Sequence, residues 1–171
     1  MPKFKAPILI IRVMFAAVFL AACGDLDSSK ADATTTTNLV VVSRFIEEFK
    51  NNANHGIVDE LMSPDFVHHL TDPRLPAGRD GIKALGQVIV AGFLDVHASV
   101  RDLISDGDKV IERTRTSATH TGEFNRIPAT GKQVGWTEIH IYRLVDGKIA
   151  EQWSEIDLLG LLVQLGAIPG A

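Results

Sequence analysis

The sequence of 171 residues contains a single cysteine, Cys23, so it can form neither an intramolecular disulfide nor a cysteine-based metal cluster. It also lacks a dense block of basic residues. Its 17 lysines and arginines are outnumbered by 21 acidic residues, and the formal net charge of −4 argues against a nucleic-acid partner. No HExxH or His-x-His spacing occurs among the six histidines. His68 and His69 are adjacent in a predicted strand, which sends their side chains to opposite faces and argues against a shared metal.

The common cofactor and nucleophile motifs are absent as well. We find no glycine-rich phosphate loop, no GxSxG elbow and no Rossmann fingerprint. With 46% hydrophobic and 22% charged residues, the chain has the composition of one globular domain. We therefore expect a domain that holds no metal, and chemistry that needs no cofactor.

The beginning of the chain is typical of an export signal. Lys3, Lys5 and Arg12 precede an apolar run at 13–22, which is shorter than the roughly 20 apolar residues of a membrane-spanning helix. The run ends in a sequence that resembles the lipobox of bacterial lipoproteins, Leu20-Ala21-Ala22-Cys23. Ordinary cleavage after a small residue, with an incidental cysteine, is the alternative.

The lipobox interpretation predicts the organisation of the whole chain. We expect a signal peptide at 1–22, a lipidated N-terminus with a flexible tether at 23–37, and a folded domain at 38–171. Residues 25–37 are mostly small and polar, so they cannot repay the cost of ordering. The protein would be exported to the bacterial cell envelope and anchored to a membrane through lipid on Cys23.

Hydrophobic periodicity predicts the elements of the domain. Residues 39–50 show helical spacing, with Glu47, Glu48 and Lys50 on the side opposite the apolar stripe. Further helices are expected at 58–62, 79–93 and 158–165, and a brief strand at 66–70. Long strand-type runs follow at 95–104, 109–121, 133–145 and 148–157. This order predicts an α+β fold, in which a cone-shaped, curved antiparallel sheet wraps over N-terminal helices and a short C-terminal helix follows. Such a cone can hold a small ligand.

The last hairpin allows its two faces to be sorted. Asp146-Gly147 favours a two-residue type I′ turn, which makes Val145 and Lys148 neighbours. Strict alternation from that pair places eight side chains on one face: Trp136, Glu138, His140, Tyr142, Glu151, Trp153, Glu155 and Asp157. We interpret this face as the wall of a polar, aromatic pocket, with its three glutamates on a solvated rim. Trp136, His140 and Trp153 would contact a substrate there, although a cross-strand histidine is also common as a packing residue. The opposite face is interpreted as a packing or homodimer surface.

Two charged residues have two interpretations each. Asp157 ends the last strand just before an apolar helix, where desolvation would raise its pKa and suit a general acid or base. The alternative is an N-cap of that helix. Arg113 either turns inward to bind an anionic or carbonyl oxygen, or pairs with Asp102 or Glu112 on the surface of the sheet.

A series of short motifs runs through residues 40–167 in a fixed order. They are Asp65-Phe66-Val67-His68-His69, Gly78-Arg79-Asp80-Gly81, Phe93-Leu94-Asp95, Gly107-Asp108-Lys109-Val110, Thr119-His120-Thr121-Gly122, Pro128-Ala129-Thr130-Gly131-Lys132, Asp146-Gly147-Lys148-Ile149 and Gln164-Leu165-Gly166. Together with Arg113, Trp153 and Asp157, this series resembles the SnoaL-like polyketide cyclases, also called predicted ester cyclases. The resemblance implies the nuclear-transport-factor-2-like cone fold.

The resemblance also implies a reaction and its residues. In this family, an aspartate at the end of the last strand removes a proton next to a carbonyl, and the enolate closes a ring by aldol attack without a cofactor. By position that catalytic residue is Asp157, and His69 matches a second catalytic position. Arg113 and Trp153 match positions that line the cavity. Ala129 and Leu94 depart from prolines that are common in the family, and a lipid anchor is foreign to it.

Two functions follow as hypotheses. The first is a cofactor-free cyclase or isomerase that acts on a small hydrophobic or polyketide-like molecule. The second is a non-catalytic, membrane-anchored lipoprotein that binds such a molecule unchanged. A structural homodimer at the envelope is a third and weaker one. Fold alone does not decide among them.

Overall fold

The computed structural model describes residues 23–69 and 72–169, and for residues 23–32 it describes the backbone alone. The expected signal peptide at 1–22 lies outside the described residues. The elements follow in the order α1 (Cys23–Phe45), η1 (Ile46–Asn51), α2 (Ile57–Leu61), β1 (Met62–His68), α3 (Gly78–Gly92), β2 (Phe93–Asp106), β3 (Lys109–His120), β4 (Gln133–Val145), β5 (Lys148–Ile156) and α4 (Leu158–Leu165). Helices, strands and their order agree with the α+β prediction.

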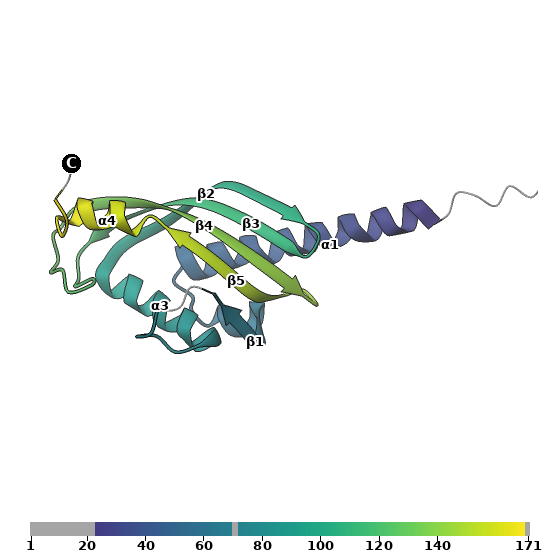
Figure 1. Cartoon of the computed structure of the whole chain (residues 1–171), viewed down its shortest axis with the longest axis horizontal. Helices are drawn as coiled ribbons and strands as arrows, with labels where there is room; N and C mark the ends of the chain where they lie inside the picture. Colours follow the sequence, from purple (N-terminus) through teal and green to yellow (C-terminus); the bar gives the residue numbers. More distant parts are fainter. Residues whose placement is uncertain (1–22, 70–71, 170–171) are drawn as a thin grey trace, which may run out of the picture.

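One curved sheet of five strands, in the order β1-β5-β4-β3-β2, organises the domain. Strands β2 to β5 pair antiparallel, whereas β1 joins the edge of β5 in parallel. The sheet curls over α1 and α3, and α4 lies at its far end (Figure 1). We call the face toward these helices the inner face and the other the outer face.

Helix α1 differs from the expected flexible tether. Residues 25–37 continue the helix that begins at Cys23, and this half of α1 projects away from the sheet (Figure 1). Within this part of the helix, the Thr37 hydroxyl donates to the Ala33 carbonyl at 2.9 Å. Among the helices of the described part, none combines the length and apolarity that crossing a membrane requires.

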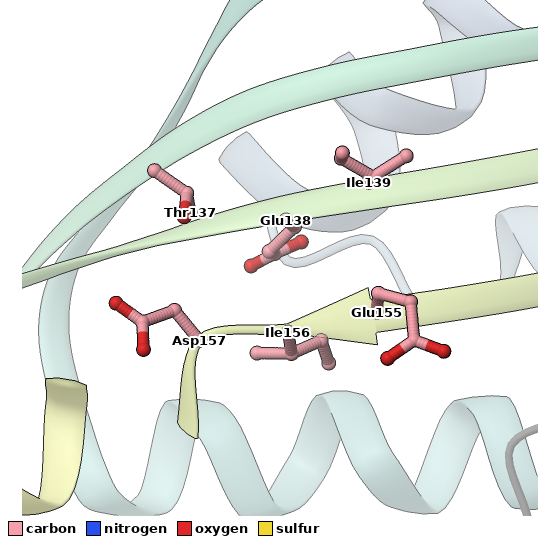
Figure 2. Close-up of a pocket in the computed structure, with 6 residues that line it drawn as sticks. All are labelled: Thr137, Glu138, Ile139, Glu155, Ile156 and Asp157. Carbon is pink, nitrogen blue, oxygen red and sulfur yellow. The ribbon is translucent and has the colours of Figure 1, made fainter. Parts of the chain in front are cut away.

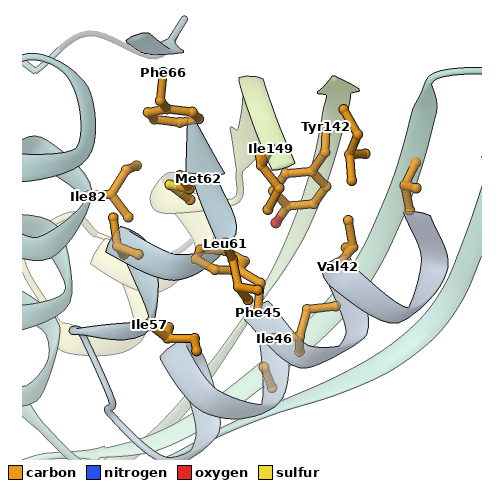
Figure 3. Packing of buried hydrophobic residues seen from close by; sticks show 14 residues of the cluster. Val42, Phe45, Ile46, Ile57, Leu61, Met62, Phe66, Ile82, Tyr142 and Ile149 are labelled. Carbon is orange, nitrogen blue, oxygen red and sulfur yellow. The ribbon is translucent and has the colours of Figure 1, made fainter. Parts of the chain in front are cut away.

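The core consists of two apolar clusters on the inner face. The larger one packs the helices near Phe45 and Leu61 against the end of β4 and the start of β5. It includes Val42, Ile46, Ile57, Met62, Phe66, Ile82, Tyr142 and Ile149 (Figure 3). The smaller one lies near α4, and it includes Phe93, Phe124, Val134, Trp136, Leu161 and Leu165. Burial of these side chains supplies the main driving force for folding. Polar side chains lie on the inner face between the two clusters. We call them the polar belt, and its members are Lys50, Glu112, Glu138, His140, Gln152 and Ser154.

The hairpin between β4 and β5 confirms the predicted turn and corrects the predicted register. Asp146 and Gly147 both have positive φ, 50° and 71°, as a type I′ turn requires. Val145 pairs with Lys148, but the pairing then shifts, and Arg143 lies opposite Glu151. Ala150 is therefore the extra residue of a β-bulge, which reverses the alternation of every later residue in β5.

The bulge means that the predicted face was wrong for the β5 residues. Trp136, Glu138, His140 and Tyr142 do share the inner face, and their partners there are Gln152 and Ser154. Trp153 belongs to the outer side instead. Two glutamates predicted on the same wall, Glu151 and Glu155, lie on that outer side as well.

Candidate active site

The polar belt is built around the ammonium group of Lys50. Its Nζ atom lies 2.6 Å from Glu112 Oε1 and 2.9 Å from Glu138 Oε2, so one cation is shared by two carboxylates. Glu112 is fully buried and Glu138 is 8% exposed. Lys50 comes from the π-helical turn η1, and the glutamates come from the neighbouring strands β3 and β4. The expectations that Lys50 lies on the solvent side of its helix and Glu138 on a solvated rim were wrong.

Each of the two carboxylates has further donors. The Trp136 indole N–H donates to Glu138 Oε1 at 2.5 Å, and the Thr116 hydroxyl donates to the same oxygen at 3.1 Å. The Tyr142 hydroxyl donates to Glu112 Oε2 at 2.5 Å. Buried charges are tolerated when they are paired and hydrogen-bonded in this way.

The electrostatics of the belt keep both glutamates ionised. Burial by itself raises the pKa of Glu138, but the Lys50 ammonium and His140 outweigh it, and the pKa lies far below its usual range. The pKa of Glu112 is also lowered, because the charge of Lys50 and the hydrogen bonds from Lys50 and Tyr142 outweigh burial. Burial lowers the pKa of Lys50, yet the two carboxylates raise it above its ordinary value. Burial and the Glu112 charge raise the pKa of Tyr142, which stays protonated.

A hydrogen-bonded chain leads from this charged centre toward β1. His140 Nε2 lies 2.8 Å from Glu138 Oε2, and His140 Nδ1 lies 2.8 Å from Ser154 Oγ. Ser154 Oγ is also 3.1 Å from Gln152 Nε2 and 3.3 Å from His68 Nε2. His68 is half-buried, and desolvation is the largest cause that lowers its pKa to about 4. At neutral pH, His68 therefore carries no charge.

Three members of the belt have the chemistry of metal ligands. One oxygen each of Glu112 and Glu138 and one nitrogen of His140 lie within 4.8 Å of one another. The Lys50 ammonium already pairs with both carboxylates at hydrogen-bond distance. A divalent cation would have to displace that ammonium.

The structure separates the residues that the sequence predicted for one site. His140 lies in the polar belt and Trp136 beside it, at 4% exposure each. His69 and Trp153 lie together at the outer side of the β1–β5 edge, where their rings stack at 4.3 Å and His69 Nε2 is 2.7 Å from Glu151 Oε2. The prediction that His68 and His69 face opposite sides is confirmed, since His68 contacts Ser154 on the inner face.

Arg113 and Asp157 are not on the inner face. Arg113 Nε donates to Asp102 Oδ2 at 2.5 Å across the outer surface of β2 and β3, which is the alternative interpretation of that residue. Asp157 is exposed, and its Oδ1 accepts from the Gly160 N–H at 2.9 Å as the N-cap of α4. The expectation that Asp157 points inward beside Trp153 and His140 was wrong, because the bulge at Ala150 precedes it. Figure 2 shows Asp157 past the end of β5.

The centre of the inner face is packed with side chains rather than hollow. Glu112, Thr114 and His140 are buried there between the two apolar clusters. One depression of about 180 Å³ reaches the belt, and its lining consists of Thr137, Glu138, Ile139, Glu155, Ile156 and Asp157 (Figure 2). A second depression of about 440 Å³ is lined by Asp95, Arg115, Ser117, Ala118, Thr119, Gln133, Val134, Gly135 and Gln164. At the polar belt, the expected ligand-sized hollow is thus reduced to a small opening beside Glu138, and the larger depression is lined by none of the belt residues.

Sequence analysis did not select Lys50, Glu112, Gln152 or Ser154. A signal for Glu112 was present, because alternation in 109–121 puts it in phase with Val110 and Ala118, which are buried. The outward set of that strand also contains an isoleucine, so the phase was ambiguous. No local signal identifies Ser154, since its face depends on the bulge.

Comparisons with known proteins agree with the fold. The model of a family described as SnoaL-like polyketide cyclase matches residues 40–165. Aklanonic acid methyl ester cyclase DnrD from Streptomyces peucetius is 25% identical over 135 residues, which cover 77% of this chain and 92% of that protein. The structure of TsrD from Streptomyces laurentii superposes with a TM-score of 0.71 at 28% identity, covering 78% of this chain and 97% of TsrD. IdmH from Streptomyces antibioticus, a candidate polyketide cyclase, superposes with a TM-score of 0.66 at 33% identity, covering 75% of this chain and 98% of IdmH.

Replacing Lys50 tests the electrostatic account of the belt. Lys50→Met leaves two buried carboxylates without a cation, and we expect a loss of about 3 to 5 kcal/mol in the free energy of unfolding at pH 7. Lys83→Met is the matched control, because Lys83 pairs with the exposed Asp59 at 2.7 Å, and it should cost less than about 1 kcal/mol. Urea denaturation of both variants and the wild type gives these values.

The pKa shifts of the belt predict how the free energy of unfolding changes with pH. The carboxyl pKa values are lowered by folding, so their contribution is present above the ordinary value of 4.5 and declines as the pH falls below it. The pKa of Lys50 is raised, so its contribution is complete below 10.5 and declines at higher pH. In Lys50→Met the carboxylates gain from protonation, and the deficit relative to wild type should shrink between pH 7 and pH 4. An equal deficit at both values would contradict the shared-cation account.

Proposed function

The chain belongs to the SnoaL-like polyketide cyclase family, and from this premise we propose that it closes a ring in a small polyketide-like carbonyl compound. The side chains of the polar belt would supply the acid–base chemistry. The observation that carries this proposal is the buried hydrogen-bonded chain from Glu138 through His140 to Ser154. In this proposal, His140 rather than Asp157 accepts the proton.

The charge of Glu138 determines what His140 can do. An ionised carboxylate only accepts hydrogen bonds, so in neutral His140 the ring proton is on Nε2, which donates a hydrogen bond to Glu138. Nδ1 is then the unprotonated nitrogen, and it accepts from the Ser154 hydroxyl. A histidine held in this tautomer is a general base on the side that faces Ser154.

Ring closure uses this base in three steps. A proton leaves the carbon next to a substrate carbonyl and reaches His140 Nδ1 by way of the Ser154 hydroxyl. The enolate then attacks a second carbonyl of the same molecule, a carbon–carbon bond forms, and the new alkoxide takes a proton back from His140. The Gln152 Nε2 group, 3.1 Å from Ser154 Oγ, is placed to donate to the enolate oxygen. Substrate and product have the same mass.

A substitution series tests the choice of base. With aklanonic acid methyl ester as probe, we expect wild-type protein to form an isomer of equal mass and to exchange the hydrogen next to the carbonyl in deuterated water. His140→Gln should lower both rates by at least about 100-fold, because the general base is lost. Asp157→Asn should leave both within a few-fold, since asparagine is also a good N-cap. Chromatography with mass spectrometry and proton NMR measure the two rates.

The same series distinguishes the competing interpretations. An inactive Asp157→Asn beside an active His140→Gln would restore Asp157 as the acid/base residue. Wild-type protein that binds the probe without isomer formation or hydrogen exchange would instead support the ligand-binding lipoprotein. Circular dichroism of each variant checks that it is folded.

We also propose that the domain is held at a membrane through lipid on Cys23. Helix α1 runs from Cys23 into the domain, and its projecting part to residue 37 spans about 20 Å at 1.5 Å per residue. Cys23→Ser should move the protein from the membrane fraction to the soluble fraction of the cell envelope. Continued retention of Cys23→Ser in membranes would count against lipidation.

A second copy of the chain is the proposed partner of the outer face. Apolar side chains remain exposed there on three neighbouring strands, with Ile104 at 56%, Ile111 at 36% and Ile139 at 46%. An exposed apolar face of this kind favours association. Ile139→Lys should convert a dimer to a monomer in light scattering, whereas Val88→Lys on α3, at 42% exposure, should not. Wild-type protein that is already monomeric would refute the dimer.

A further inference from the structure

Three side chains of the polar belt stand in the order of a hydrolase triad. Ser154 Oγ lies 2.8 Å from His140 Nδ1, and His140 Nε2 lies 2.8 Å from Glu138 Oε2. All three residues are buried, at 8%, 4% and 8% exposure. A serine, a histidine and a carboxylate that are hydrogen-bonded in this order activate the serine oxygen on several unrelated folds, and geometry rather than sequence position identifies them.

The direction of each hydrogen bond from Ser154 to Glu138 agrees with that role. Glu138 is held ionised by Lys50, His140 Nε2 donates to it, and His140 Nδ1 is left to accept the Ser154 proton. The positive charge that His140 gains on accepting this proton would form 2.8 Å from a carboxylate. This is how the carboxylate assists a serine nucleophile.

The surroundings of Ser154 supply the other groups that acyl transfer needs. Gln152 Nε2 and His68 Nε2 lie 3.1 and 3.3 Å from Ser154 Oγ, close enough to donate to an oxygen on the carbon that Ser154 attacks. Gln152 Oε1 is buried without a hydrogen-bond partner in the described part of the chain. It can therefore accept a hydrogen bond from a water molecule that enters the site.

We propose that Ser154 is a nucleophile and that the site hydrolyses small esters. Ser154 Oγ forms a bond to the acyl carbon as its proton passes to His140 Nδ1. The bond between the acyl carbon and the alcohol oxygen then breaks, and the alcohol leaves with the proton from His140. Water attacks the resulting acyl-serine ester with His140 again as base, which releases the carboxylic acid and restores the serine hydroxyl. This reaction goes beyond ring closure, although it uses the same hydrogen-bonded chain.

The burial of Ser154 limits the acyl group. Ser154 is 8% exposed, and the residues that line the depression of about 180 Å³ beside Glu138 do not include Ser154, His140 or Gln152. His68 contacts Ser154 from β1 and is half-buried. A short acyl group such as acetyl is therefore the expected substrate part.

Acetylation by para-nitrophenyl acetate tests the proposal on the full chain. We expect wild-type protein to release a burst of one equivalent of nitrophenol and to carry an acetyl group on the peptide that contains Ser154, as found by mass spectrometry. Ser154→Ala should lose both the burst and the label. His140→Gln should slow the burst by at least about 100-fold. Ser117→Ala is the matched control, since Ser117 also lies within a strand but is exposed on the outer face, and it should behave as wild type.

The outcomes separate this reaction from ring closure. An acetyl label on lysine or histidine, or an unchanged burst in Ser154→Ala, would overturn the proposal and leave the cyclase assay unaffected. If Ser154→Ala does not fold, Ser154→Cys takes its place, and it should acquire the acetyl group as a thioester. Failure of Ser154→Cys to become labelled would overturn the proposal too. Conversely, a labelled Ser154 in a protein that forms no cyclic product would support the esterase and refute the cyclase.

Discussion

The ammonium group of Lys50 is the constraint on which the inner face of this domain depends. Neighbouring strands direct Glu112 and Glu138 into a region with almost no contact with water, and two carboxylates buried side by side would strongly oppose folding. Lys50 provides the cation for both, across 62 and 88 residues of sequence. Because η1 carries Lys50, the same contact fastens the helical layer to the middle of the sheet. The charged state of Glu138 then fixes the tautomer of His140, so the chemistry of the site follows from an ion pair needed for the fold.

A single extra residue in β5 determines which chemistry that site contains. Without the bulge at Ala150, the inner face would carry Glu151, Trp153 and Glu155 opposite the belt. With it, Gln152 and Ser154 are the inward residues, and the belt receives a hydroxyl and an amide in place of further carboxylates. Glu151, Trp153 and Glu155 lie on the outer side instead, where the Trp153 ring stacks on His69. In the proposed reactions, His140 is therefore the base on the inner face, and Glu138 is its hydrogen-bonded partner.

The sequence predicted the fold well because the signals for helices, strands and turns are local. The apolar stripes, the Asp146-Gly147 turn and the long alternating runs each specify their own element. The site was predicted less well because its signals are not local. Lys50 follows two glutamates in an amphipathic helix, a pattern that normally indicates a solvent-facing side, and its true partners lie on two distant strands. Ala150 carries no mark of a bulge, so the register of β5 could not be derived from the hairpin turn alone. The sequence permits two interpretations each of Asp157 and Arg113, and in the structure Asp157 caps α4 while Arg113 pairs with Asp102.

The position of His140 explains why a belt that costs free energy to bury can still serve a reaction. The buried groups outside His140 comprise two carboxylates and one ammonium, and they leave one negative charge uncompensated. A base in such a place forms its positive charge beside a partner that is already oriented, so little reorganisation accompanies proton transfer. The partner is held from three sides by Lys50, Trp136 and Thr116, which prevents it from turning toward the substrate. In the proposed reactions, Glu138 therefore supports His140 without competing for the proton, and Ser154, Gln152 and His68 are the groups that would contact a substrate.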